Sequence, residues 1–226
     1  MSAPDRAFTA RHVQLARALF AAIAALMITF SSDHSAAIGL SVFGGFAVGT
    51  ALVLSLGAWL AVPKGRRAPL VLLAVIDLIA GVIAGIPALQ GDDLFFALVV
   101  SWAMLTGLVE VLFAIRARRS GDPTARDGII AGVLGLLLGV LMLLIPSGFV
   151  LDYFVEGAGD LTLTGIILGV GMFGGYACFI AVLMGIAGFS PTPPSKPVES
   201  AADAGPTSAD SGAATSAPAE TSGGVA

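Results

Sequence analysis

The sequence GIIAGVLGLLLGVLMLLIP, residues 128–146, contains no charged side chain and is long enough to cross a lipid bilayer as a helix. A hydrocarbon core about 30 Å thick takes about 20 helical residues. Comparable apolar runs fill most of the first 189 residues: Val13–Phe30, Ala37–Val62, Ala68–Leu89, Leu94–Ile115, Gly128–Pro146 and Leu161–Phe189. The sequence therefore predicts an all-α integral membrane protein with six transmembrane helices.

The composition agrees with this class. The 226-residue chain is 57% hydrophobic and 12% charged, whereas a soluble domain is about 25% charged. Its 29 glycines and few aromatic residues suit closely packed membrane helices better than an outer-membrane barrel. No nucleotide-binding, hydrolase or zinc-protease motif occurs, and the single cysteine, Cys178, lies in an apolar run. We therefore expect no enzymatic activity, no catalytic residue, no cofactor, no metal site and no nucleic-acid binding.

The basic residues indicate how the chain is oriented. Short loops rich in Lys and Arg stay in the cytoplasm. Ten of the eleven basic residues precede the first run or follow the second, fourth or sixth, and the eleventh, Arg17, lies near the start of the first. The other connections carry carboxylates instead: Asp33, Asp92, Asp93, Asp152, Glu156 and Asp160. This pattern predicts a multi-pass membrane protein with both termini in the cytoplasm.

The expected domains are a cytoplasmic N-terminus (1–12), a transmembrane domain (13–189) and a disordered cytoplasmic tail (190–226) rich in Pro, Ala, Ser and Thr. Arg17 interrupts the first run and leaves Ala18–Phe30 as its unbroken apolar part. That length also fits the core of a cleaved signal peptide, which would leave five spans. We favour a retained helix, because an arginine near a helix end can reach the membrane interface.

A weak internal repeat divides the six runs into three parallel hairpins. The stretches Gly81–Pro87 and Gly139–Pro146 match, and Pro87 and Pro146 are expected at the outer ends of their helices. Small residues four apart, such as Gly81 with Gly85 and Gly135 with Gly139, let membrane helices approach closely. These glycines could form an oligomer interface, but packing within one bundle explains so many pairs better.

Asp77 and Glu110 are the only carboxylates well inside apolar runs, and such residues usually face the bundle interior and have a function. Their depths match, so a hairpin could bring them together, and two adjacent desolvated carboxyl groups could hold or relay a proton. Alternatively, Glu110 pairs with Arg116 or Arg118, and Asp77 accepts a hydrogen bond from Thr106 or a backbone group.

Two further expectations concern aromatic residues. Trp102 and Tyr176 should fill packing gaps between the helices. The aromatic and acidic segment 147–160 should lie at the membrane interface.

The hairpin pattern resembles the HdeD-like family of small bacterial membrane proteins associated with acid resistance. The matching residues are Gly81–Pro87, the sequence GLVEVLFAIR at 107–116, and Gly132–Pro146, and the resemblance covers roughly Leu15–Phe189. It implies six helices, a location in the bacterial cytoplasmic (inner) membrane, no catalytic site and a role in acid or envelope stress. The chain departs from the pattern in its first hairpin, in the long segment before the sixth run and in its tail.

Three functions follow as expectations. The first is a non-enzymatic membrane protein of HdeD type, with proton-linked behaviour of Asp77 and Glu110. The alternatives are a small transporter or channel component, and a membrane subunit of a larger complex. The lipid bilayer is the expected partner. The sequence leaves open whether the chain also forms a homo-oligomer or binds another membrane protein.

Overall fold

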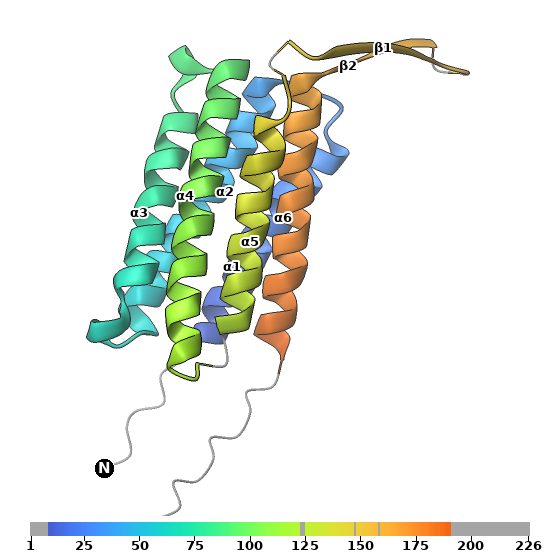
Figure 1. The fold of residues 1–226 in the computed structure, drawn as a ribbon. Helices are drawn as coiled ribbons and strands as arrows, with labels where there is room; N and C mark the ends of the chain where they lie inside the picture. The colour runs from blue at the N-terminus through green and yellow to red at the C-terminus, as the bar shows by residue number, and fades with distance from the viewer. Residues whose placement is uncertain (1–8, 123–124, 147, 158, 191–226) are drawn as a thin grey trace, which may run out of the picture. The chain divides into compact units, whose positions relative to one another are not determined.

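The computed structural model describes residues 9–122, 125–146, 148–157 and 159–190. In these residues the chain forms α-helices that run up and down side by side (Figure 1): α1 (Ala10–Phe30), α2 (Ala36–Leu60), α3 (Ala68–Ala84), α4 (Asp92–Arg119), α5 (Ala125–Leu143) and α6 (Gly165–Phe189). The six expected spans thus correspond to six helices. The expected cytoplasmic tail lies almost wholly outside the described residues.

Five of these helices, all but α3, are long and apolar enough to cross a membrane. Helix α3 has 17 residues, about 25 Å at 1.5 Å per residue, and ends at Ala84 instead of the expected Leu89. The reason is Pro87, which disfavours helical backbone at Ile86 and begins a short 3₁₀ turn, Pro87–Leu89. Pro146 likewise lies three residues beyond the end of α5. Both prolines therefore follow their helices, just outside them.

The expectation of an all-α chain is wrong between α5 and α6. Strands β1 (Val150–Val155) and β2 (Gly159–Thr164) pair in antiparallel fashion, and α6 begins four residues later than the expected Leu161. Val, Tyr and Phe favour strands, and the turn contains Gly157 and Gly159 at φ of 91° and 86°, which glycine adopts readily. The segment expected at the interface is thus mostly a β-hairpin.

The most extensive helix packing joins α4 with α5, α1 with α6, and α2 with α3. In each of these pairs, the two helices come from different predicted hairpins. At Gly107 and Gly132 the backbones of α4 and α5 touch: a Cβ atom added to Gly132 would lie 2.7 Å from the Gly107 carbonyl oxygen and 2.8 Å from the Val111 nitrogen. Small residues at this contact therefore decide how closely α4 and α5 approach.

Three of the four glycines predicted to pack helices lie against a neighbouring helix. Gly81 faces α2, and Gly135 and Gly139 face α4. Gly85 has only carbonyl oxygens of its own helix within 4 Å of an added Cβ atom. Packing within one chain thus accounts for these three glycines.

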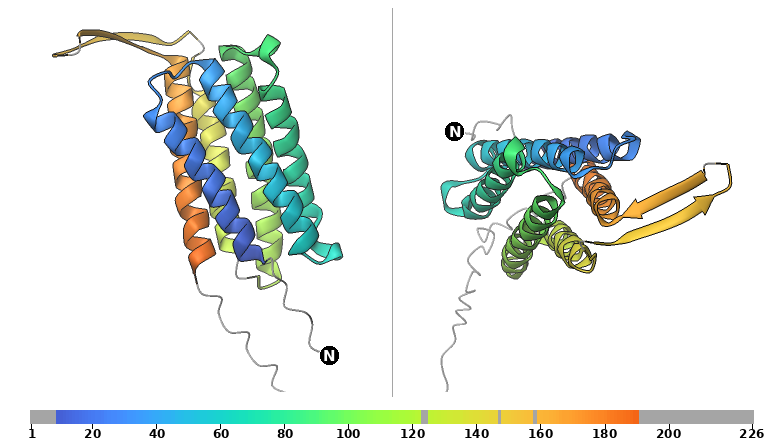
Figure 2. Two further views of the ribbon diagram at one scale, coloured as in Figure 1. Left: turned by 180° about the vertical axis from the view of Figure 1, so that it is seen from behind. Right: turned by 90° about the horizontal axis from the view of Figure 1, so that it is seen from above.

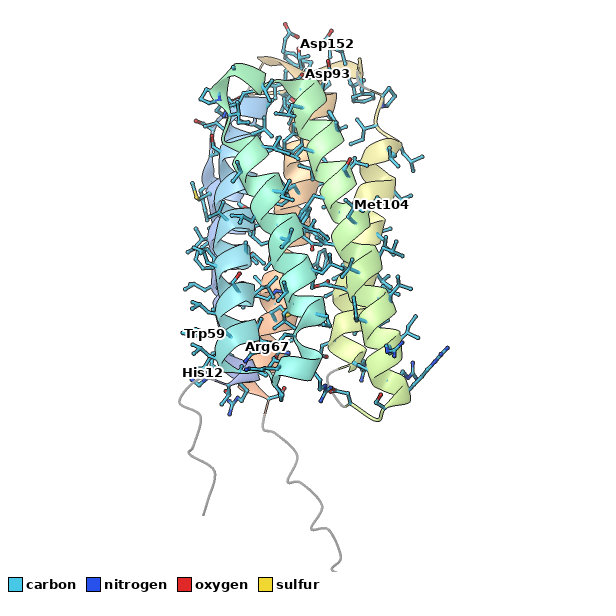
Figure 3. The ribbon with its side chains drawn as sticks, turned by 90° about the vertical axis from the view of Figure 1, so that its left-hand side faces the viewer. His12, Trp59, Arg67, Asp93, Met104 and Asp152 are labelled. Atoms are coloured by element: carbon cyan, nitrogen blue, oxygen red, sulfur yellow. The ribbon has the colours of Figure 1, made fainter. Side chains whose placement is uncertain are left out.

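The two ends of the bundle differ in charge. Helix α1 begins and α6 ends at the same end (Figure 1). His12 at the start of α1 lies at that end together with Arg67, whereas Asp93 and Asp152 lie at the opposite end (Figure 3). The folded chain thus separates its basic loops from its acidic loops by the length of the helices.

Candidate functional site: a charge cluster between the helices

Arg17 turns into the bundle and pairs with Glu110. Its Nη2 lies 2.7 Å from Glu110 Oε1, and the two side chains are only 19% and 10% exposed. Arg17 belongs to α1 and Glu110 to α4, so the ion pair joins helices far apart in sequence. The alternative in which Glu110 pairs with Arg116 or Arg118 is therefore wrong. Those arginines lie further along α4, in its last turn, whereas Arg17 reaches Glu110 from α1.

Asp77 lies beside this pair and is almost fully buried, at 3% exposed. Its Oδ1 accepts a hydrogen bond from the indole Nε1 of Trp102 over 2.6 Å. Thr106, the expected donor, instead donates its hydroxyl to the backbone oxygen of Trp102, 2.7 Å away. That bond is local to α4, where a threonine readily bonds the carbonyl four residues earlier. Trp102, from the next helix, therefore provides the hydrogen bond to Asp77.

Edge-on aromatic contacts hold Trp102 in place. Its ring centroid lies 5.2 Å from that of Phe43 and 5.8 Å from those of Phe46 and Tyr176, with the planes nearly perpendicular. Such edge-to-face pairs are favourable and fix the direction of the indole N–H. We expected Trp102 to be a packing residue. In the structure it packs and also donates to a buried carboxyl group.

A small cavity of about 10 Å³ lies where these groups meet. Its polar lining comes from five helices: Arg17 of α1, Thr50 of α2, Asp77 of α3, Trp102 and Glu110 of α4, and Tyr176 of α6. A cavity of this volume accommodates about one water molecule. Among the described residues, the buried hydroxyl of Thr50 has no hydrogen-bond partner. The site is thus a compact polar centre within a largely apolar bundle.

Asp77 and Glu110, the two carboxylates singled out in the sequence, line this same cavity. In the described part of the chain each has its own partner, and no hydrogen bond joins them directly. One guanidinium faces two carboxyl groups, so full ionisation would leave one negative charge without a counter-ion. An uncompensated charge is expensive away from water. The charge count allows the cluster to hold one proton.

Sequence reasoning found both carboxylates but missed the roles of Arg17, Trp102 and Thr50. The signal for Arg17 was present, because it is a lone cation within an apolar run that also lacks acidic residues. Two buried acids should have prompted a search for a cation on another helix. Thr50 carried no comparable signal, since threonines are common in membrane helices.

Within the described residues, no three His, Cys, Asp or Glu side chains come together in a metal-binding arrangement. The chain matches no family model, and no curated protein or solved structure is significantly similar to it.

Proposed function

We propose that this chain is a non-enzymatic, multi-pass protein of the bacterial cytoplasmic membrane, of HdeD type, that acts in acid or envelope stress through a proton held by the Arg17–Glu110–Asp77 cluster. The observation that carries the proposal is the shared cavity, where the partly buried guanidinium of Arg17 meets the partly buried carboxyl group of Glu110 and the buried one of Asp77. The resemblance of residues 107–116 to the HdeD-like pattern adds the stress role.

The ion pair supports a retained first helix. Arg17 was the reason to consider a cleaved signal peptide, yet its side chain lies between the helices and is bound to Glu110. Loss of α1 would leave Glu110 without this cation and would also remove the extensive packing between α1 and α6. These contacts favour α1 as a retained transmembrane helix over a cleaved signal peptide.

The separation of charge supports the proposed orientation. The loop Lys64–Arg66 and the arginines at the end of α4 lie at the end where α1 begins and α6 ends, as does Arg67 (Figure 3). Because basic loops remain on the cytoplasmic side, this arrangement supports a topology in which the start of α1 and the end of α6 both lie in the cytoplasm. The carboxylate-rich end then faces outward.

The packing order supports the proposed three-hairpin repeat. The most extensive contacts join α2 with α3, α4 with α5, and α6 with α1. Each of these contacts lies between two successive hairpins, and the contact of α6 with α1 joins the third hairpin to the first. Three equivalent hairpins arranged around one axis would produce this alternation. Asp77 and Glu110 both belong to the middle hairpin, so the cluster gives that hairpin a distinct role.

The size of the cavity favours a proton over a larger solute. A space of about 10 Å³ admits about one water molecule, so no sugar, amino acid or hydrated ion fits. A proton needs no additional volume and balances the charge of the cluster. We therefore place proton binding, rather than solute transport, at this site.

Survival of a deletion strain in acid tests the proposal. We expect the deletion strain to lose viability at low external pH, the wild-type gene to restore it, and an Asp77→Asn variant of equal abundance in the membrane not to restore it. Normal survival of the deletion strain would remove the acid-resistance role. Full rescue by Asp77→Asn would show that the role does not depend on the cluster.

A further inference from the structure

The β1–β2 hairpin extends sideways from the carboxylate-rich end of the bundle. It runs nearly at right angles to the helices and beyond them (Figure 1). The strands show their broad faces in the view from above and their thin edges in the side view (Figure 2). The sheet therefore lies roughly perpendicular to the helix axes, with one face toward the helix side and the other away from it.

The two faces of the hairpin differ in chemistry. Successive side chains of a strand alternate between faces, and directly paired residues share a face. The pairs Leu151 with Leu163 and Tyr153 with Leu161 therefore lie on one face together with Val155, and every side chain there is apolar or aromatic. The other face carries Asp152, Asp160, Thr162 and Thr164, with Val150 and Phe154.

The orientation of the polar face can be read from Asp152. In Figure 3 the Asp152 side chain lies at the outermost edge of the structure, on the side away from the helices. It accepts a hydrogen bond from Thr162 on the neighbouring strand, 2.6 Å away, which fixes both side chains on this face. The apolar face is therefore turned back along the helix axes, toward the level of the helices.

The hairpin is joined to the bundle without a linker. Strand β2 ends at Thr164 and α6 begins at the next residue, Gly165. The Gly165 N–H donates to the carbonyl oxygen of Phe149, 2.9 Å away, so the entry to β1 and the start of α6 are tied together. This junction holds the sheet at a fixed height relative to the helices.

We propose that the apolar face of the hairpin rests on the lipid of the outer leaflet, at the interface between headgroups and acyl chains. The inference depends on the proposed membrane-spanning bundle. Helix α6 has 25 residues, about 37 Å, whereas the hydrocarbon core is about 30 Å thick. The start of α6, and the sheet attached to it, then lie at the level of the headgroups.

Exposure and stability favour lipid as the occupant. On the apolar face Leu151, Tyr153, Val155 and Leu161 are 38–49% exposed within the described structure. A two-stranded hairpin is marginally stable in water and needs a surface to pack against. Tyrosine is enriched at the membrane interface, and the opposite face presents its carboxylates to water. The lipid surface supplies the missing apolar layer.

Spin labels at single cysteines test this inference in lipid nanodiscs with the full chain. The background is Cys178→Ala, and labels are placed at Leu161→Cys on the apolar face, Asp160→Cys on the polar face and Phe179→Cys on α6. Phe179 is 65% exposed in the middle of the apolar surface and serves as the lipid reference. Collisions with oxygen report contact with lipid, and collisions with a nickel chelate report contact with water.

We expect the Leu161 label to favour oxygen, as the Phe179 label does, and the Asp160 label to favour the chelate. Equal access of the chelate to the labels at Leu161 and Asp160 would place the hairpin in water and overturn the inference. Shielding of the Leu161 label from both reagents would also overturn it, because a second copy or another protein would then cover this face. A Phe179 label that favours the chelate would overturn the membrane-spanning bundle itself, and the inference with it.

Discussion

Arg17 on α1 donates a hydrogen bond to Glu110 on α4 over 2.7 Å, although 93 residues separate them in the chain. The contact ties the first helix to the middle of the bundle. It also explains how an arginine is tolerated in an apolar run, because its charge is compensated inside the protein instead of at the membrane surface. The proposed function depends on this pair and on Asp77 beside it.

Replacing Arg17 by methionine should destabilise the bundle strongly. Removing one partner of a buried ion pair leaves the other charge uncompensated and costs about 3–5 kcal/mol. Unfolding of the purified protein in mixed micelles, titrated with a denaturing detergent, measures the free energy of unfolding. Arg66→Met is the matched control: Arg66 pairs with Asp122 over 2.7 Å but is 67% exposed. It should cost at most about 1 kcal/mol.

A double variant, Arg17→Met with Glu110→Gln, should recover part of the loss. Both charges are then absent, and the remaining amide can be hydrogen-bonded within the cluster. The loss in free energy of unfolding of the double variant is compared with the sum of the losses of the two single variants. A loss larger than that sum would show that the ion pair does not account for the effect of Arg17.

Trp102→Phe should lower the free energy of unfolding by about 2 kcal/mol, because Asp77 loses its indole donor and stays buried. Trp59→Phe is the control, since Trp59 is 71% exposed and a surface substitution changes stability by about 0.5 kcal/mol or less. The same detergent titration compares the two variants. Equal small effects would mean that the Trp102–Asp77 bond adds nothing to stability.

Gly132→Ala should separate α4 from α5 and cost about 1–3 kcal/mol, because the new methyl group would meet the backbone of Gly107 and Val111 at 2.7–2.8 Å. Gly175→Ala on α6 is the control, since an added Cβ atom there has nothing within 4 Å. Thermal unfolding in the same micelles checks the pair. A Gly132 variant as stable as the Gly175 variant would argue against backbone contact between these helices.

The orientation predicts which loops are reached from outside. In a Cys178→Ala background, Asp33→Cys should react with a membrane-impermeant maleimide on intact cells, whereas Lys64→Cys should react only after the membrane is permeabilised. Asp33 and Lys64 lie in connections at opposite ends of α2, so one helix separates the two probes. The reverse labelling pattern would invert the proposed topology.

The helices and their order could be predicted from the sequence because length and apolarity decide membrane insertion. Residues 128–146 and the other runs appear in the structure as helices, with ends that differ by a few residues. The short α3 was missed because its apolar run continues beyond Pro87, and hydropathy does not report where the backbone leaves the helix. The β-hairpin was missed because the end of β2 continues directly into the apolar run of α6, and the mixed aromatic and acidic residues of 147–160 predicted an interfacial segment without strands.

The candidate site could be predicted only in part. Asp77 and Glu110 stood out because carboxylates within membrane spans are costly. Their partners depend on which helices are neighbours, and the extensive packing joins helices of different hairpins. The sequence without the spatial arrangement does not show that the Arg17 side chain of α1 reaches Glu110 of α4, or that the indole of Trp102 donates to Asp77 of α3.

Infrared spectroscopy of the protein in liposomes tests the proton-holding cluster most directly. A protonated carboxyl group in an apolar surrounding gives a C=O stretching band apart from those of carboxylates and peptide groups. We predict such a band in the wild-type protein at neutral pH and its loss in the Asp77→Asn variant, with Asp93→Asn at the bundle end as the control that retains it. A wild-type spectrum without the band, or an Asp77→Asn spectrum that keeps it, would contradict a proton held at Asp77 in this cluster.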